Sequence, residues 1–188
     1  MTLLRIFPAE LTDVWDACTN PERIPHWFLP VSGELRENGR YRLEGNAGGT
    51  VTRCDAPHGF AATWEFGDDT SWVELRLESE GDERTRFKLE HIAYVDERWA
   101  QFGPGAVGVG WEGALIGLYL YLTTRQAVDR VEMAKWTASD EGRRFLALSS
   151  GAWCEADMVH GSDPAEARAA ADRTTAFYTG MPPADAGK

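Results

Sequence analysis

The sequence predicts an α+β fold in which a curved antiparallel sheet surrounds one long apolar helix, with a helical extension after it. Three observations lead to this prediction. Residues 31–91 alternate between apolar and charged side chains, residues 107–125 are too apolar for a helix exposed to water, and two amphipathic segments follow residue 126. A sheet with one apolar face must be covered, and the segment 107–125 is the long apolar candidate within the first two-thirds of the chain.

Length, charge and cysteine content narrow the class of protein. The chain has 188 residues, a formal net charge of −11 and three cysteines. An acidic protein repels phosphate backbones, and widely spaced cysteines in an odd number are typical of reduced thiols. The first ten residues lack the apolar region of a signal peptide, and the apolar run at 114–122 is too short to span a bilayer. We therefore expect a cytoplasmic protein that binds neither nucleic acid nor membrane.

Two short helices are predicted between the first strand and the sheet. Residues 2–7 are predicted to form the strand, and Pro8 with the two residues after it starts a helix. The apolar face of this helix carries Leu11, Trp15 and Cys18. The sequence Asn20-Pro21-Glu22 indicates a second helix start, because asparagine caps well and proline suits the first helical position.

A meander of about six strands follows, which makes six to seven strands with the first. Asn38-Gly39 is a strong hairpin signal, and sequences rich in glycine and aspartate separate the later strands. The residues predicted to face the core are Tyr41, Leu43, Phe60, Ala62, Trp64, Phe66, Ser71, Val73, Leu75, Leu77, Thr85, Phe87, Leu89 and His91. The charged residues between them are interpreted as a solvated face with cross-strand ion pairs.

The apolar helix has two contrasting sides. Its large side carries Trp111, Leu115, Leu118 and Leu122, with Tyr119 at the margin. Its small side carries Gly110, Gly113 and Gly117. A glycine in a helix costs about 1 kcal/mol relative to alanine, so this stripe needs a reason. Either another backbone packs closely there, which is the commoner cause, or that side faces a hollow.

The segment after residue 125 is predicted to form two helices. One starts at Ser139 and places Phe145, Leu148, Ala152 and Val159 on its apolar face. The other starts at Asp163-Pro164 and ends at Gly180. The apolar side of this second helix carries Ala167, Ala170, Ala171, Thr174, Phe177 and Tyr178.

The predicted organisation is a domain at 1–125, a helical extension at 126–180 and a flexible tail at 181–188. The extension is predicted to pack on the core or on a partner subunit, which leaves a monomer or a homodimer.

An ordered set of residues along 2–123 resembles the activator-of-heat-shock-ATPase-like branch of the START-related superfamily (SRPBCC, helix-grip). The matching pieces, in order, are Phe7-Pro8-Ala9, Val14-Trp15, Asn20-Pro21-Glu22, Trp27, Gly39, Thr63-Trp64, Thr85, Leu89-Glu90-His91, Gly110-Trp111 and Leu115. The resemblance implies a START/Bet v-like helix-grip fold with a cavity between sheet and helix that takes an apolar small molecule. Members of the superfamily include lipid carriers, polyketide cyclases, self-sacrificing resistance proteins and a chaperone-binding domain, so the fold does not settle the function.

The implied cavity gives a set of candidate ligand-binding residues. They are Tyr41, Trp64, Phe87, His91, Trp111, Leu115 and Tyr119. His91 is either a polar anchor for a ligand or a structural histidine bonded to a backbone carbonyl or water. For most of the others, plain core packing is the alternative.

No cofactor, metal site or catalytic residue is predicted. The glycines at 103–108 and 108–113 fit the dinucleotide pattern, but no strand follows the helix as such a site requires. Cys154, Asp157 and His160 are three residues apart, which does not complete a metal shell.

Three functions remain open. The leading hypothesis is a non-enzymatic protein that binds an apolar or aromatic small molecule, held by burial and oriented by His91 and a tyrosine. The second is a cyclase- or hydrolase-like enzyme that uses His91 or a tyrosine as acid or base. The third is a chaperone-interacting module, although the sequence shows no separate N-terminal chaperone-binding domain.

Overall fold

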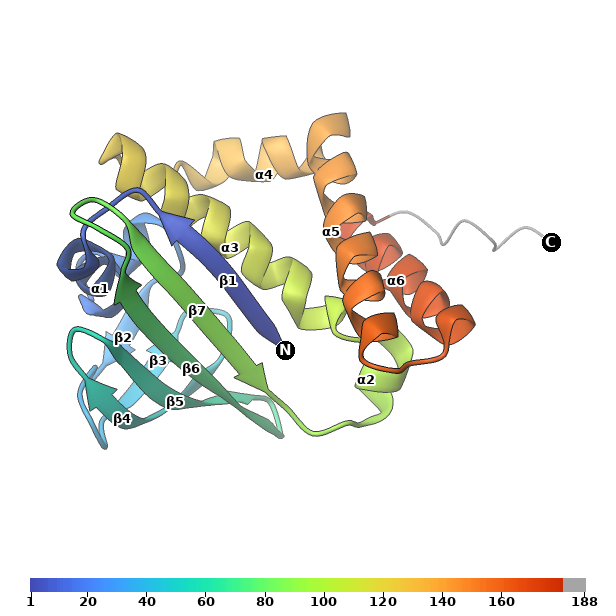
Figure 1. Ribbon diagram of the computed structural model, residues 1–188, viewed down its shortest axis with the longest axis horizontal. Coiled ribbons are helices and arrows are strands. Elements are labelled where there is room, and N and C mark those ends of the chain that lie inside the picture. The colour runs from blue at the N-terminus through green and yellow to red at the C-terminus, as the bar shows by residue number, and fades with distance from the viewer. Residues whose placement is uncertain (181–188) are drawn as a thin grey trace. The chain divides into compact units, whose positions relative to one another are not determined.

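The computed structural model has the predicted α+β architecture and describes residues 1–180 (Figure 1). The chain forms two compact units. The first contains Met1–Tyr94 and Ile116–Val128, and the second contains Val95–Leu115 and Asp129–Lys188, described as far as residue 180. The long helix therefore contributes its second half to the first unit and its first half to the second. The tail predicted at 181–188 lies outside the described residues.

The first unit is built on a seven-stranded antiparallel sheet, which confirms the predicted sheet. Its strands are β1 (Thr2–Phe7), β2 (Val31–Gly33), β3 (Arg40–Leu43), β4 (Gly48–Asp55), β5 (Gly59–Phe66), β6 (Asp69–Ser79) and β7 (Thr85–Ile92). The order across the sheet is β1-β7-β6-β5-β4-β3-β2. Strands β2 to β7 form a meander, and β1 pairs with β7 at one edge (Figure 1).

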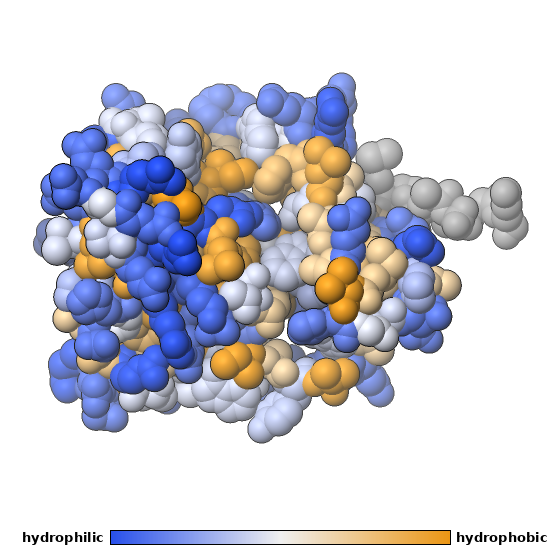
Figure 2. Space-filling view, in the orientation of Figure 1, coloured by the Kyte–Doolittle hydropathy of each residue, from blue (hydrophilic) through white to orange (hydrophobic). Residues whose placement is uncertain are grey.

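The register of the strands confirms the predicted alternation of faces, except that Phe66 at the end of β5 is 49% exposed and not in the core as predicted. On the inner face of β6 and β7, Leu75 pairs with Leu89 and Val73 pairs with His91. Leu75 is 2% exposed, as expected for a side chain in the core. On the outer face the partners are charged, as in Arg76 opposite Lys88. The surface over the sheet is accordingly mostly hydrophilic with scattered hydrophobic side chains (Figure 2).

The β2–β3 hairpin turns where Asn-Gly predicts it. Asn38 has a φ of 63°, the left-handed conformation that asparagine tolerates better than most residues. Strand β2 ends at Gly33, earlier than the apolar pattern to Leu35 suggests. Gly33 has a φ of 98°, and an added Cβ would lie 2.2 Å from the carbonyl oxygen of Arg40. The chain must leave the strand there, and only glycine fits.

The helical segment between β1 and β2 differs from the prediction in two respects. Helix α1 (Leu11–Thr19) buries Val14 and Ala17 completely, whereas the predicted face of Leu11, Trp15 and Cys18 is only half-buried. A small alanine marks the inward side of a helix poorly in the sequence. The second helix is a single 3-10 turn, η1 (Ile24–His26), and Asn20 accepts the backbone N–H of Glu22 at 2.9 Å, the bond expected of a capping asparagine.

The long helix α3 (Gly105–Thr124) is 20 residues long. Its length and composition alone would suit a membrane span, but it is a core helix of this fold, with Leu118 and Leu122 only 0% and 2% exposed. At Gly117 an added Cβ would lie 2.6 Å from the carbonyl oxygen of Trp27. Close backbone packing is therefore the reason for this glycine. An added Cβ at Gly113, by contrast, would have no heavy atom within 4 Å among the described residues, apart from the helix's own backbone and the adjoining residues.

The second unit consists of helices. They are α2 (Glu97–Phe102), the first half of α3, α4 (Arg130–Ala138), α5 (Asp140–Val159) and α6 (Pro164–Thr179). The predicted starts of the last two are confirmed, because Ser139 accepts the N–H of Gly142 and Asp163 accepts those of Ala165 and Glu166. Helices α2 and α4 were not predicted.

The predicted apolar face of α5 is wrong. Leu148 and Val159 are 64% and 87% exposed, and the buried stripe includes Leu146, Ser150 and Trp153 instead. Ser150 donates a hydrogen bond from Oγ to the carbonyl oxygen of Ala171 on α6 at 2.8 Å. A serine inside the buried stripe makes that side of the helix look polar in the sequence.

Helix α6 packs on α5 and α2 and touches the start of α3. Ala167, Ala170 and Thr174 on α6 are buried as predicted, but Phe177 is 64% exposed. Tyr178 donates a hydrogen bond to the carbonyl oxygen of Ala106 at 2.8 Å. Glycines on α3 allow other side chains to come close. An added Cβ at Gly108 would lie 2.3 Å from the indole of Trp153 on α5, and one at Gly105 would lie 3.1 Å from Thr174 on α6.

Gly113 and Gly117 of α3 make a matched pair for a stability test. Replacing Gly117→Ala forces the new methyl group against backbone and is expected to lower the free energy of unfolding by about 1–3 kcal/mol. Replacing Gly113→Ala meets no such atom and is expected to raise it by up to about 1 kcal/mol through helix propensity. Urea denaturation of both variants measures this difference. Equal effects would contradict the close approach at Gly117.

Candidate functional site

The inner face of the sheet has an aromatic and polar end around His91. His91 lies on β7 and is 5% exposed. Its ring contacts Trp64 of β5 edge to face, with centroids 6.0 Å apart. Its Nε2 lies 2.9 Å from Oγ of Ser71 on β6, and that hydroxyl donates to the carbonyl oxygen of Trp64 at 3.1 Å. Three neighbouring strands therefore position one connected polar group.

The hydrogen bonds define the protonation of this group. The Ser71 hydroxyl has one hydrogen, and assigning it to the carbonyl of Trp64 makes Nε2 of His91 the donor to Ser71. Burial and, to a smaller degree, the positive charge of the N-terminal amine lower the pKa of His91 from 6.5 to about 4. At neutral pH the imidazole of His91 is thus uncharged. This end of the inner face can hold a neutral ring and offer hydrogen bonds, but the imidazole is no ready proton donor of pKa near 7.

Tyr41 lies on β3 and pairs with Gly49 of β4, close to the end of β5 that carries Trp64. Its hydroxyl donates to the carbonyl oxygen of Thr63 on β5 at 2.6 Å, beyond the neighbouring Gly49 of β4. Burial and the nearby carboxylate of Glu65 raise the pKa of Tyr41, so the phenol stays protonated. Its ring is half-buried.

The other predicted ligand-binding residues lie in different surroundings. Phe87 is 3% exposed and packs edge to face on Phe7 with ring centroids 5.3 Å apart, a contact typical of core. Tyr119 is 49% exposed on the second half of α3. Trp111 and Leu115 belong to the second unit. The structure thus brings Trp64 and His91 together, and a ligand-binding role for any of the seven residues stays a prediction.

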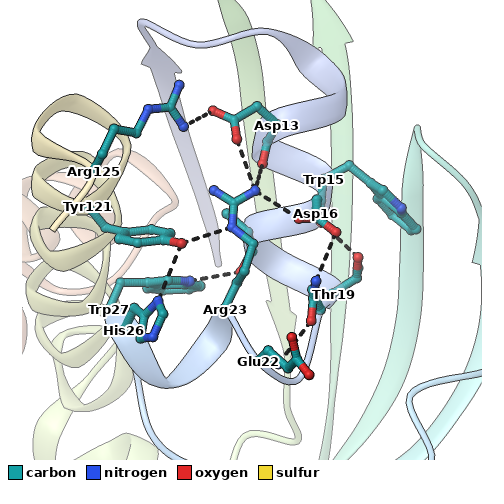
Figure 3. Close-up of polar contacts among 12 residues, drawn as sticks. Asp13, Trp15, Asp16, Thr19, Glu22, Arg23, His26, Trp27, Tyr121 and Arg125 are labelled. Atoms are coloured by element: carbon teal, nitrogen blue, oxygen red, sulfur yellow. Dashed lines mark hydrogen bonds and ion pairs between the residues drawn. The ribbon is translucent and has the colours of Figure 1, made fainter. Parts of the chain in front are cut away.

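A polar cluster around Arg23 joins α1, η1 and the end of α3, and sequence reasoning missed it (Figure 3). The guanidinium donates to Asp13 Oδ1 and Asp16 Oδ2, each at 2.9 Å, and from Nε to the hydroxyl of Tyr121 at 2.9 Å. Arg125 pairs with the second oxygen of Asp13. Hydrogen bonds to both carboxylates and to Tyr121 outweigh burial and raise the pKa of Arg23, so it is always charged.

The same cluster fixes the chain on both sides of η1. His26 lies with Nδ1 3.4 Å from the Tyr121 hydroxyl, and its carbonyl oxygen accepts the N–H of Val128 at 2.7 Å. Trp27 donates from its indole to the carbonyl of Ala17 at 2.9 Å. These bonds anchor the α1–η1 segment to the end of α3. The available sequence signal was two acids at i and i+3 on α1, which is too common to identify a partner.

No metal site is evident in the part of the chain that the structure describes, and the thiol of Cys18 is not activated. Within residues 1–180, no group of three His, Cys, Asp or Glu side chains is placed to hold a metal ion. Burial raises the pKa of the Cys18 thiol to about 12, despite the opposing effect of Arg23, so it is a poor nucleophile.

A seven-stranded antiparallel sheet with a long core helix after it defines a helix-grip-like protein, as the sequence resemblance implies. Residues 8–123 match the family described as Activator of Hsp90 ATPase homolog 1-like protein. The chain belongs to this family.

Solved structures extend the likeness beyond the family segment. The crystal structure of CalU16 from Micromonospora echinospora is 34% identical, with a TM-score of 0.67, and the similarity covers 85% of this chain and 87% of that one. The solution structure of the same protein gives 33% identity, a TM-score of 0.71, and coverage of 86% and 87%. Since residues 1–123 make up less than 85% of the chain, the similarity reaches into the helices after α3.

A more distant structure shares the fold alone. DynU16, from the dynemicin biosynthetic locus, is 21% identical over 68% of this chain and 48% of that one, with a TM-score of 0.59. No curated protein matches the chain.

The role of the Tyr121 hydroxyl can be tested with a neighbouring tyrosine as control. Tyr121→Phe leaves Nε of Arg23 without its acceptor and is expected to cost about 1–2 kcal/mol of unfolding free energy. Tyr119→Phe alters an exposed ring on the same helix and is expected to change stability by less than about 0.5 kcal/mol. Chemical denaturation compares the two. A larger loss for Tyr119→Phe would contradict the anchoring role.

The lowered pKa of His91 predicts an acid-sensitive stability. The unfolded chain binds a proton on His91 below pH 6.5, which the folded protein does not bind until about pH 4. The contribution is complete above pH 6.5 and is lost as the pH falls toward 4, by up to about 3 kcal/mol. Denaturation at several pH values should show that His91→Gln removes this part of the slope. Parallel profiles for wild type and variant would contradict it.

Proposed function

We propose that this protein binds an apolar or aromatic small molecule between the inner face of its sheet and the second half of α3. The proposal is supported chiefly by one observation, the uncharged edge-to-face pair of Trp64 and His91 with a half-buried indole. Family membership agrees with it, because the helix-grip superfamily uses this face for ligands.

The inner face differs along its length in a way that suits a ligand at one end. Leu75, Leu77 and Leu89 are at most 4% exposed, so the aliphatic end is closed by core packing. Toward the other end of the face, Trp64 is only half-buried although it faces the same side. Accessible aromatic rings beside a few polar atoms are the usual lining of a small-molecule site.

The polar groups would orient the ligand. With its N–H given to Ser71, neutral His91 presents a ring face and an edge without charge. An uncharged aromatic ligand can stack on the indole of Trp64 without the desolvation cost that a charged ligand would meet. The low pKa of His91 argues against the alternative in which it serves as a general acid at neutral pH.

The first experiment is native mass spectrometry of freshly purified protein, together with an organic extract of the same sample. A bound species of a few hundred daltons, released on denaturation, is the expected result and would identify the chemical class. If the purified protein contains no bound molecule, binding is tested with an added probe.

Nile red, a neutral aromatic dye, is the added probe. Trp64→Ala is expected to weaken its binding about tenfold by removing the stacking surface. Trp72→Ala is the matched control, because Trp72 lies on the neighbouring strand and faces the opposite side of the sheet. Fluorescence titration measures the affinity of both variants for the dye. Absence of dye binding, or equal loss in both variants, would refute the proposed site.

A further inference from the structure

We propose that the outer face of strands β2 to β5 carries a binding site for a small carboxylate, with Arg42 as its anchor. The site is a surface hollow of about 330 Å³, which is within the range of small-molecule pockets. It is lined by Ser32, Gly33, Arg40, Tyr41, Arg42, Gly48, Glu65 and Gly67.

The register of the sheet explains why a hollow exists there. Ser32 pairs with Arg42, Arg42 with Gly48, and Gly48 with Glu65. Paired residues of an antiparallel sheet share a face, so these four form one row across four strands. Since Trp64 faces inward, its neighbour Glu65 and the rest of the row face outward. The missing side chain in the middle of the row leaves the space.

Gly48 is required at that position. An added Cβ would lie 2.9 Å from the carbonyl oxygen of Tyr41 and 3.3 Å from Cδ of Arg42. The stem of Arg42 therefore runs over the backbone of Gly48, along the floor of the hollow. This places a guanidinium beside open space, where it can approach a ligand from the side.

The charges of the hollow do not balance. Arg40 donates to Oε2 of Glu65 at 2.9 Å, and Thr63 donates to Oε1 at 3.0 Å. The bond from Arg40 and then that from Thr63 lower the pKa of Glu65, which keeps this ion pair formed. Among residues 1–180 the side chain of Arg42 has neither an ion pair nor a hydrogen bond. The lining thus carries one uncompensated positive charge on a protein of net charge −11.

A carboxylate fits these groups better than other anions. A planar guanidinium binds a carboxylate through two parallel hydrogen bonds, and one negative charge balances the single excess positive charge. Ser32, opposite Arg42 in the row, adds a hydroxyl donor.

This site is independent of the function proposed above. β5 contributes Trp64 to the inner face and Glu65 to the outer face, so the two sites are on opposite sides of one strand. The inner group is neutral, whereas the hollow is charged. Only Tyr41 belongs to both sets of candidate residues.

Benzoate is the probe, with benzamide as the uncharged analogue and inorganic phosphate as the alternative anion, at constant ionic strength. The backbone amides of Gly33, Gly48 and Gly67 line the hollow and report binding in a heteronuclear NMR titration. We expect saturable shifts of these amides with benzoate and none with benzamide. Equal responses to the two compounds, or no response to benzoate, would overturn the proposal. Tighter binding of phosphate would overturn the assignment to carboxylates.

Variants distinguish a specific contact of Arg42 with the ligand from a general effect of the protein's charge. Arg42→Gln is expected to weaken benzoate binding at least about tenfold, because a charge-assisted bidentate pair is lost. Arg84→Gln removes the same charge from an exposed position outside the hollow and should leave binding within about twofold. Glu65→Gln releases Arg40 and should strengthen binding roughly threefold. Equal losses for the two arginine variants would refute the role of Arg42.

A final variant keeps the two proposals distinguishable. His91→Gln lies on the inner face and should leave benzoate binding within about twofold, because distant sites act additively. A loss of benzoate binding in this variant that matches the loss in Arg42→Gln would place the probe on the inner face and overturn the outer site.

Discussion

The arrangement of the first unit depends on one partly buried guanidinium. Arg23 holds two carboxylates of α1 and the hydroxyl of Tyr121 on α3, and its side chain is only 18% exposed. A charge removed from water to this extent is stabilised only while all its partners are present. The cluster therefore fixes both the position of the α1–η1 segment and the register of the second half of α3 against it. Gly117 follows from the same constraint, because Trp27 comes directly after η1 and its carbonyl touches the helix there.

The sequence predicted those features of the fold that depend on residues close together in the chain. The alternation through Val73, Leu75 and Leu77 is a property of neighbouring residues, so the strands and their inner face were found without knowledge of their partners. The helix starts at Ser139 and Asp163 depend on side chains that bond within their own first turn, and both were predicted.

Other failures, unlike the wrong face of α1, involve partners far away in the chain. Arg23 and Tyr121 are 98 residues apart, and the sequence around one of them does not indicate that it contacts the other. The buried side of α5 includes Ser150, whose polarity is satisfied by a carbonyl of another helix. Charged residues on the outer face were all interpreted as solvated or paired. This holds for Arg40 with Glu65 and for the exposed Arg42, although the sequence did not show that Arg42 has no partner among the described residues.

The two faces of the sheet are chemically separated by the alternation of β5. On the inner side, burial keeps His91 neutral and Tyr41 protonated, which favours an uncharged ligand. On the outer side, the strand partners of Glu65 leave a guanidinium in excess, which favours an anion. Because adjacent residues of one strand serve the two faces, a shift of register by one residue would exchange them and bury the charges. Gly33, Gly48 and Gly49 lie where neighbouring strands approach too closely for a Cβ, so they help hold the register on which both proposed sites depend.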